Sequence, residues 1–203
     1  MSIEIKISKR RISYKIAMKI LHKRVEELKA NRGKELLWIL EHPLTYTAGI
    51  RSDKKEILDK EIKIIKTNRG GRITLHNPGQ KIIYFALNLN KRKKDVRKLI
   101  NLIEKSIIEF LNIHKIKGKK DKKNIGIWVN ENKIAAIGLR ISKWIAYHGC
   151  SININNNLNP YLKIIPCGLD NNKITSVYNE KGKINKDINK KLIEIFLKNI
   201  NKI

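Results

Sequence analysis

Residues 69–89 of the chain read RGGRITLHNPGQKIIYFALNL. The segment 73–76 predicts a short strand, the Asn-Pro-Gly-Gln sequence at 77–80 predicts a turn, and the apolar segment 82–89 predicts a longer strand. The paired glycines at 70 and 71 allow the backbone to approach a neighbour or a ligand closely. This stretch predicts two strands at the centre of the fold, preceded by a tight, glycine-rich loop.

Further strands and helices are expected on both sides of this stretch. Alternating or continuous apolar residues predict strands at 2–8, 36–40 and 62–65, and a hairpin with a first strand at 125–129, a turn at 130–132 and apolar segments that continue to 154. Helical spacing predicts a helix capped by Ser13 that runs to about residue 30, a second opened by Asp95 over about 17 residues, and a third at 188–200. The segment 157–170 reads as loop or short helix. Strands interrupted by a few long helices predict an α+β fold with a mixed, mainly antiparallel sheet and flanking helices, in a single domain over residues 1–203.

The composition is strongly basic, with a formal net charge of +27. Of 45 basic residues, 35 are Lys, and they are mixed with 38 Ile and 22 Asn along the whole chain. All three residue types have A/T-rich codons, so genomic bias is a sufficient explanation and is favoured over nucleic-acid binding, for which the ten Arg are few. Attraction of acidic protein partners remains a third explanation.

The cysteine and hydropathy patterns limit which compartment and which kinds of site the protein can have. Two cysteines and five scattered histidines give no CxxC pair, no disulfide framework and no zinc-ligand spacing, so we expect no metal. A disulfide between Cys150 and Cys167 is disfavoured. No apolar segment approaches the ~18 residues of a membrane span. The amino-terminal segment reads as a strand and not as a signal peptide, which predicts a cytoplasmic protein that does not act at a membrane.

Two residues attract attention for their chemistry, and each has a plainer explanation. Cys167 lies between Pro166, which fixes its own backbone φ angle, and Gly168, which allows conformations that other residues avoid. Its thiol is a strong nucleophile once it is deprotonated. By itself a cysteine is more often a small buried hydrophobe. Lys133 precedes small residues, but one Lys among 35 is normally a solvated side chain. His148 reads by default as a core or turn histidine.

A set of short motifs lies in a fixed order along the chain. Its residues are Glu41 to Leu44, Thr47, Gly49, Arg69 to Gly71, Thr74, His76, Pro78 to Gln80, Gly126, Val129, Lys133, Ile134, Ile137, Gly138, Arg140, His148, Gly149, Asn153, Asn155, Asn156, Leu158 and Pro166 to Gly168. Any one of these motifs is weak, but their order and spacing are specific. Together they resemble the lipoyl(octanoyl) transferase family from about residue 36 to 177.

The resemblance implies the fold of the lipoate and biotin protein ligase catalytic domain, and an acyltransferase without a cofactor. In that family the cysteine that matches Cys167 attacks the thioester of an octanoyl group on acyl carrier protein. The lysine that matches Lys133 lowers the thiol pKa and acts as general acid and base. The octanoyl group then passes to a lysine of a lipoyl domain, in an E2 subunit of a 2-oxoacid dehydrogenase or in the glycine cleavage H protein. From first principles, a thiolate beside an ammonium and a two-step transfer through an S-acyl enzyme agree with this chemistry.

By the same match, three segments are expected to bind the acyl substrate. They are Arg69, Gly70, Gly71, Arg72, Ile73, Thr74, Leu75 and His76, then Ala136, Ile137 and Gly138, then Gly149, Cys150 and Ser151. The chain departs from the family at Asn77, where Gly is usual, at Leu75, where an aromatic residue is common, and at Cys150, where an apolar residue is usual. These departures bear on chain-length preference and leave Lys133 and Cys167 in place.

Three other functions are weighed against octanoyl transfer. An ATP-dependent lipoate or biotin ligase on the same fold would use free acid and ATP and would not depend on Cys167. A basic nucleic-acid-binding module would bind in a salt-sensitive way, but no aromatic-rich recognition motif is present. An inactive paralogue is disfavoured because both reactive residues are present. The sequence predicts a monomer whose partners are the acyl carrier protein and the lipoyl domain, with no nucleic acid.

Overall fold

A computed structural model describes residues 2–121, 124–166, 173–184 and 187–203. Its main sheet has seven strands in the order β1-β2-β6-β10-β9-β8-β7. These strands are β1 (Ile3–Ile7), β2 (Glu35–Leu40), β6 (Gln80–Asn88), β7 (Lys119–Lys120), β8 (Ile127–Val129), β9 (Asn132–Ser142) and β10 (Ile145–Asn153). Strand β1 runs parallel to β2 and the remaining pairs are antiparallel, which confirms the predicted mixed, mainly antiparallel sheet.

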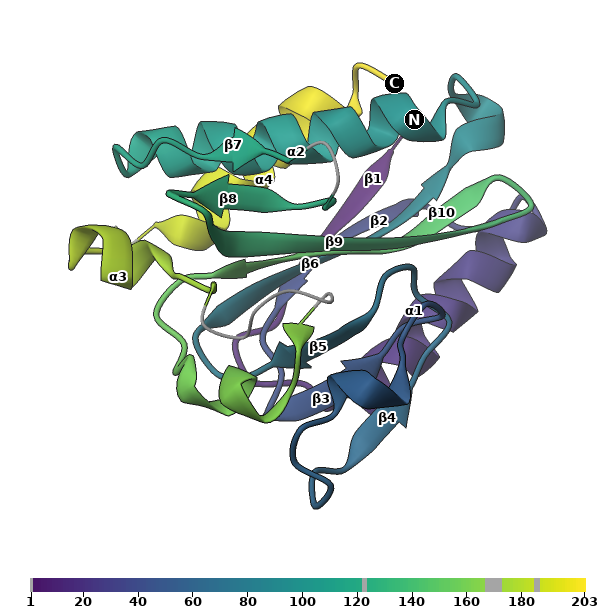
Figure 1. Ribbon diagram of the computed structural model, residues 1–203. Helices are drawn as coiled ribbons and strands as arrows, with labels where there is room; N and C mark the ends of the chain where they lie inside the picture. The colour runs from purple at the N-terminus through teal and green to yellow at the C-terminus, as the bar shows by residue number, and fades with distance from the viewer. Residues whose placement is uncertain (1, 122–123, 167–172, 185–186) are drawn as a thin grey trace.

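A second sheet of three strands, in the order β4-β3-β5, lies below the main one in Figure 1. Its strands are β3 (Thr45–Ala48), β4 (Ile64–Lys66) and β5 (Ile73–His76). The strand predicted at 62–65 is therefore shifted by about two residues. Strands β5 and β6 follow one another in the sequence with the predicted turn between them, yet they belong to different sheets, so the turn carries the chain from one sheet to the other.

The helices agree with the predicted caps. Helix α1 (Tyr14–Lys29) begins after Ser13, whose hydroxyl accepts a hydrogen bond from the Ile16 amide, and α2 (Val96–Ile113) begins after Asp95, whose carboxylate accepts from the Lys98 amide. The other helices are α3 (Val177–Lys181), α4 (Ile188–Ile200) and the 3-10 helices η1 (Lys54–Glu56), η2 (Leu89–Lys91) and η3 (Asn159–Lys163). Helix η3 is the short helix allowed for in the segment 157–170, of which residues 167–170 lie outside the described part.

The alternation of side chains along the strands gives the main sheet two different faces. On one face, odd-numbered residues of β2 and β6, such as Leu37 and Phe85, pack against α2 and α4, which cross the upper side of the sheet in Figure 1. On the other face, even-numbered residues such as Trp38 and Tyr84 pack against α1. The small sheet lies on this second side, so the space between the two sheets is where a site can form.

The predicted hairpin is present with a tighter turn than expected. Strand β8 starts at Ile127 and its turn consists of Asn130 and Glu131, both in the left-handed region with φ of 45° and 68°. Two consecutive left-handed residues are typical of the two-residue hairpin turn that matches the twist of the strands. Asn132 therefore belongs to β9, and the turn sets the register that delivers Lys133.

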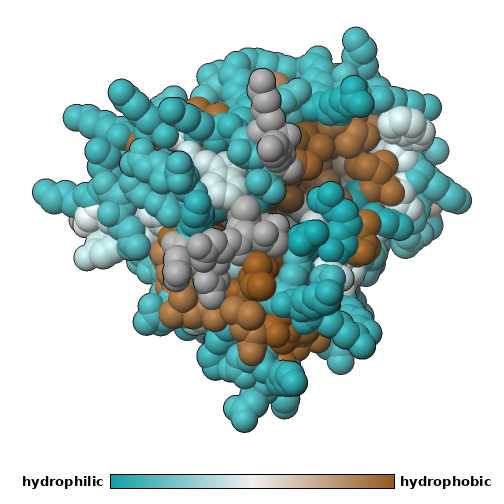
Figure 2. All heavy atoms as spheres, viewed as in Figure 1, coloured by the Kyte–Doolittle hydropathy of each residue, from teal (hydrophilic) through white to brown (hydrophobic). Residues whose placement is uncertain are grey.

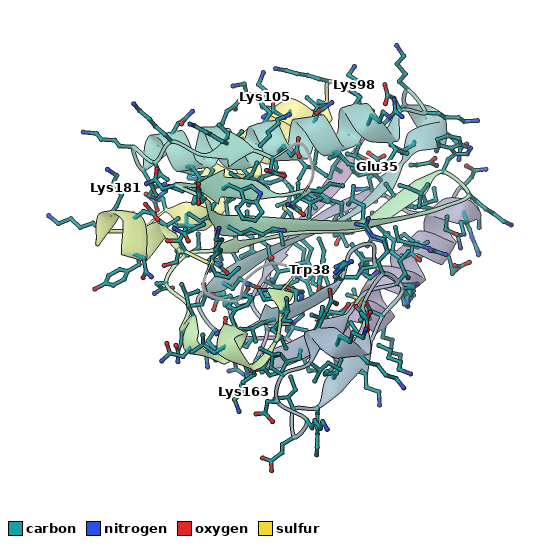
Figure 3. The ribbon with its side chains drawn as sticks, viewed as in Figure 1. Glu35, Trp38, Lys98, Lys105, Lys163 and Lys181 are labelled. Carbon is teal, nitrogen blue, oxygen red and sulfur yellow. The ribbon has the colours of Figure 1, made fainter. Side chains whose placement is uncertain are left out.

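The surface reflects the basic composition. Hydrophilic residues cover most of the face in Figure 2, with hydrophobic residues gathered in a few areas. The labelled lysines Lys98, Lys105 and Lys181 point outward in Figure 3, whereas Trp38 lies in the interior. Within the described ranges, none of the helices combines the length and the apolar character needed to cross a membrane.

Candidate active site

A cavity of about 380 Å³ opens between the main sheet, β5 and the loop at 69–72. It brings together most of the residues that the sequence predicts for the site, although they come from three separate segments. The predicted residues in its wall are Arg69, Gly71, Arg72, Thr74, His76, Lys133, Ala136, Ile137, Gly138, Gly149, Cys150 and Ser151.

Gly70, Ile73 and Leu75 are not among the described residues that line the cavity. In β5, successive side chains point to opposite faces, so Thr74 and His76 face the cavity while Ile73 and Leu75 are buried in a small apolar core under the second sheet. The prediction that the whole segment 69–76 lines the pocket is corrected: in the loop, Arg69, Gly71 and Arg72 line it, and in β5 only Thr74 and His76 do. Gly70 instead packs against β9, where its amide donates to the Leu139 carbonyl at 3.0 Å.

The wall also contains residues that the sequence did not assign to the pocket. These are Tyr14, Arg51, Ile82, Tyr84, Asn124, Ile125 and His148. The alternation of side chains along β6 could have predicted that Ile82 and Tyr84 line the same surface, since they lie on one face of the strand. Tyr14 follows a helix cap and has no local signal, because only the packing of α1 against the sheet brings it to the cavity.

Lys133 is buried at the wall of the cavity, with only 5% of its surface exposed. Its Nζ donates to the Ile125 carbonyl at 3.1 Å and lies 5.4 Å from the ring centre of Trp128. Gly126 makes room for this side chain, since a Cβ at that position would lie 2.6 Å from Lys133 Cε. Gly126 also has a φ of 142°, which side chains rarely tolerate. The hairpin therefore holds the ammonium in one place at the cavity edge.

Cys167, the predicted nucleophile, lies outside the described residues. The chain on each side of the undescribed segment 167–172 does reach Lys133. Pro166 lines a small hollow together with Lys133, Thr74 and Ser151. On the other side, the Lys133 amide donates to the Lys173 carbonyl at 2.8 Å. The segment that contains Cys167 thus leaves and rejoins the described structure beside Lys133.

The loop at 69–72 is organised by the buried guanidinium of Arg69. Arg69 donates to the Thr47 carbonyl at 2.8 Å, to the Arg72 carbonyl at 2.8 Å and to the Gly70 carbonyl at 3.0 Å. Charged donors make strong hydrogen bonds, so one side chain ties the loop to β3 and fixes its curvature. Arg72 points to Glu56, with an Nη1–Oε1 distance of 2.8 Å.

Two buried histidines, His76 and His148, line the cavity, and His42 packs against His76 with ring centres 5.6 Å apart. Burial, and secondarily the proximity of the ionisable His42, lowers the pKa of His76 to about 3. Burial and the nearby Arg69 lower the pKa of His148 to about 3. Burial also lowers the pKa of His42. These side chains are therefore neutral at pH 7 and act there as hydrogen-bonding groups, not as charges.

The third wall segment, in β10, combines a glycine and a thiol. A Cβ at Gly149 would lie 1.9 Å from the Ile83 carbonyl oxygen, so no side chain fits there. Burial raises the pKa of the Cys150 thiol well above its usual range, which keeps it protonated and unreactive. The Cys150 side chain belongs to the apolar core on the α2–α4 side of the sheet, so it has the chemistry of a small hydrophobe.

Among the residues that the structure describes, no group of three or more His, Cys, Asp or Glu side chains is arranged to hold a metal ion. Lys133 is one of the described groups at the cavity that can take part in chemistry, together with the backbone amides of the walls.

Comparison with known proteins identifies the family. Residues 13–197 match the lipoyl protein ligase A/B catalytic domain. The chain belongs to this family. The match includes both walls of the cavity and the segment with Cys167, and it confirms the resemblance drawn from the ordered motifs.

Relatives in the family are named octanoyltransferase. The protein from Bartonella tribocorum is 41% identical over 87% of this chain and 78% of its own length. The protein from Wolbachia pipientis wMel is 44% identical over 84% of this chain and 86% of its own length.

Solved structures with the same fold include ligases. A lipoate-protein ligase A bound with ATP superposes with a TM-score of 0.75 at 12% identity, over 98% of this chain and 86% of that one. Biotin protein ligase from Aquifex aeolicus gives a TM-score of 0.53 at 19% identity, over 98% of this chain and 69% of that one. At these identities the likeness concerns the fold, and it confirms the predicted α+β architecture of lipoate and biotin ligases.

Proposed function

We propose that this chain is an octanoyltransferase of protein lipoylation. It moves an octanoyl group from a carrier protein to a lysine of a lipoyl domain, through an S-octanoyl intermediate on Cys167. The observation that carries the proposal is the convergence on Lys133, where the cavity wall and both described ends of the Cys167 segment meet. Relatives that are 41% and 44% identical and named octanoyltransferase support the choice of acyl group.

In the first step, the Cys167 thiolate attacks the thioester carbonyl of the octanoyl carrier. An S-acyl bond to Cys167 forms, the bond to the carrier sulfur breaks, and the carrier leaves as a thiolate that takes up a proton. The ammonium of Lys133 favours the thiolate form of Cys167 electrostatically, and its proton is available to the departing sulfur.

In the second step, the amine of the acceptor lysine attacks the S-octanoyl carbonyl. An amide bond forms, the Cys167 sulfur leaves as a thiolate, and the proton lost by the amine passes to Lys133, which is thereby restored. The acyl group arrives activated as a thioester, so neither step needs ATP.

The cavity walls offer a place for the acyl chain. Ala136 and Gly138 on β9 and Gly149 on β10 form an apolar surface that begins close to Lys133. Burial of methylene groups there contributes about 0.8 kcal/mol each. The backbone amides of these walls are candidates to stabilise the tetrahedral oxyanion, each worth roughly 3 kcal/mol in other acyl-transfer enzymes.

The partners and setting follow from this chemistry. The donor is octanoyl-acyl carrier protein, and the acceptor is the lipoyl domain of a 2-oxoacid dehydrogenase E2 subunit or of the glycine cleavage H protein. A net charge of +27 favours docking of acidic partners. The protein acts as a monomer in the cytoplasm, where a free nucleophilic thiol remains reduced.

The test of the intermediate is the mass of the intact protein after incubation with octanoyl-acyl carrier protein. The wild type and Cys150→Ala should each gain one octanoyl group, and Cys167→Ala should gain none. Cys150→Ala is the matched control because it removes the other thiol of the chain. A normal adduct on Cys167→Ala would show that the assignment of the nucleophile is wrong.

The test of the reaction compares two donors. With a lipoyl domain as acceptor, octanoyl-acyl carrier protein alone should suffice, whereas free octanoic acid with ATP should give no product. Product only from acid and ATP, unaffected by Cys167→Ala, would assign the chain to the ligase reaction of the same fold.

A further inference from the structure

Strand β10 contains one residue whose side chain lies on the opposite face of the sheet from the one that alternation gives it. Ala146 and Cys150 belong to the apolar core on the α2–α4 side, so strict alternation would place His148 on that side as well. The His148 ring instead stacks on Tyr147, with ring centres 4.9 Å apart, and lies 6.4 Å from the ring centre of Tyr84. Both tyrosines belong to the core on the α1 side. His148 therefore lines the cavity.

A left-handed backbone conformation accompanies this change of face. His148 has a φ of 66°, although it lies inside a strand that pairs without interruption with β6 and β9. Residues other than glycine rarely adopt this conformation, because the Cβ atom crowds the following carbonyl. Strained residues of this kind are found where the position of the side chain serves a function. The strain thus directs attention to what the imidazole does in the cavity.

The hydrogen bonds of Asn68 determine which nitrogen of His148 carries the proton. Asn68 Nδ2 donates to the Tyr147 hydroxyl at 3.0 Å, so its Oδ1 is the atom that faces His148 Nε2, at 2.7 Å, and accepts the proton from that nitrogen. The other nitrogen, Nδ1, is therefore an acceptor. It is buried, and no residue that the structure describes donates a hydrogen bond to it.

An acceptor in this position calls for a neutral donor from within the cavity. Burial, with a smaller effect of the nearby Arg69, lowers the pKa of His148 to about 3, so Nδ1 keeps its lone pair at pH 7. A buried acceptor without a partner is destabilising, and one that receives a hydrogen bond is not. The positive charge of Arg69 disfavours an ammonium at the same place. A hydroxyl group, of water or of a ligand, is the donor that fits.

His148 lies far from Lys133 along the cavity. It is the register partner of Leu139 on β9, six residues beyond Lys133, so the two levels are about 20 Å apart at about 3.4 Å per residue. The wall between them includes the small residues Ala136, Gly138 and Gly149. An octanoyl chain that starts beside Lys133 is shorter than this interval and leaves space in front of the imidazole.

We propose that His148 forms a polar end to the acyl cavity, where Nδ1 accepts a hydrogen bond from a hydroxyl group, and that this end limits the length of saturated acyl chains. With an octanoyl group bound, the hydroxyl is that of a water. A longer saturated chain displaces the water and leaves Nδ1 without a partner. A long chain with a hydroxyl on its last carbon takes the place of the water. The inference rests on the proposed function in one respect, that the acyl chain occupies this cavity.

The first test uses the wild-type protein and carriers that differ only in the acyl chain. The kcat/KM for transfer to a lipoyl domain is measured for octanoyl, decanoyl, dodecanoyl and tetradecanoyl groups, which identifies the chain length at which transfer falls. The chain of that length is then compared with its ω-hydroxy derivative. The hydroxyl should raise kcat/KM about 10-fold, because it pairs an acceptor that the saturated chain leaves unpaired. The same hydroxyl on a chain too short to reach His148 should give no gain.

The second test removes the imidazole. Glycine tolerates the left-handed region, so His148→Gly is the variant that keeps the backbone. The kcat/KM of the excluded saturated chain, relative to that of octanoyl, should rise about 10-fold, and the gain from the ω-hydroxyl should disappear. The result for the hydroxyl separates a polar end from simple steric exclusion, which would relax the length limit without any preference for a hydroxyl.

His114→Gly is the matched control. His114 is also a buried histidine with one bonded nitrogen, since its Nδ1 lies 3.0 Å from the Phe110 carbonyl, and with an Nε2 that has no partner among the described residues. It follows α2 and is not among the described residues that line the cavity. This variant should keep the wild-type chain-length profile and the gain from the ω-hydroxyl.

The outcomes separate this inference from the proposed function. Absence of a gain from the ω-hydroxyl in the wild type overturns the polar end, and this result does not depend on whether His148→Gly folds. Identical chain-length profiles for folded His148→Gly and His114→Gly overturn it as well. In both cases octanoyl transfer by the wild type leaves the proposed function standing. A wild type that transfers no acyl group from any carrier overturns the proposed function, and with it this inference.

Discussion

The two faces of the main sheet are built from the same strands but from different chemistry. Where β6 and β10 face α2 and α4, the core is almost entirely apolar, and Phe85 packs on Phe196 with ring centres 5.7 Å apart. Where the same strands face the small sheet, their end is polar, with Gln80 opposite Asn153 and His76 beside them. Period-2 alternation allows one strand to serve both purposes.

The difference teaches which residues stabilise the fold and which serve the reaction. Apolar burial is non-directional and tolerates rearrangement, whereas a buried amide is stabilising only with its partners in place. We therefore expect substitutions on the α2–α4 face to change stability and leave kcat intact. Substitutions on the cavity face should change kcat more than stability. The following experiments test that division.

Phe196→Ala should have the largest effect on stability. The ring is fully buried between α4 and the sheet, and its removal should lower the free energy of unfolding by about 3–5 kcal/mol, measured by urea denaturation. The kcat of the folded fraction should stay within about twofold of the wild type. A large fall in kcat at full folding would mean that the two faces are coupled.

Lys133→Met should have the converse effect. Loss of the ammonium should lower kcat by about 1,000-fold, which is ~4 kcal/mol of the barrier, because the thiolate is no longer favoured and the amine proton has no acceptor. The urea midpoint should change little. Lys105→Met, on the exposed side of α2, is the control and should leave kcat unchanged. Equal kcat values for the two variants would contradict the role of Lys133.

Gly126→Ala tests whether the placement of the Lys133 amino group matters, without removing the lysine. The new Cβ would lie 2.5 Å from the Ala135 carbonyl oxygen and 2.6 Å from Lys133 Cε, so the strand that carries Lys133 and the lysine side chain both have to move, and the kcat should fall about 100-fold. Gly182→Ala is the matched control, because Gly182 also has a positive φ, of 67°, but nothing lies within 4 Å of its added Cβ. Similar losses of kcat in both variants would mean that backbone strain, not displacement of Lys133, is responsible.

Acidification should destabilise the cavity face. His76 and His148 have folded pKa values of about 3 against an ordinary value of 6.5, so between these limits the unfolded chain binds the protons and stability falls as pH falls. From pH 6.5 to 5 each histidine should remove up to about 2 kcal/mol from the free energy of unfolding.

Urea denaturation at several pH values between 7 and 5 measures this slope. His148→Asn is the informative variant, since His148 has a φ of 66° and Asn tolerates the left-handed region better than most residues. It should reduce the slope by up to about 1.4 kcal/mol per pH unit. An unchanged slope would place the proton uptake elsewhere in the molecule.

The sequence by itself determined most of the long elements and the family, but it did not predict β3 (Thr45–Ala48). Helix caps at Ser13 and Asp95 and the apolar periodicity of α2 and α4 are local properties, and local rules predict them. The same rules predicted a turn before Lys133, but not that it has only two residues. The ordered motifs from Glu41 to Gly168 were sufficient to recognise the family, because their spacing reflects one shared fold.

The tertiary structure decided which of these residues meet. Sequence could not separate Thr74 and His76 from Ile73 and Leu75, because the face toward the cavity is set by the pairing of β5 with β3 in a second sheet. It gave no sign of Tyr14 in the wall, nor of Asn153 reaching Thr175. Such contacts join residues far apart along the chain, and the free energy that selects them comes from packing the two sheets and α1 together, which no local pattern contains.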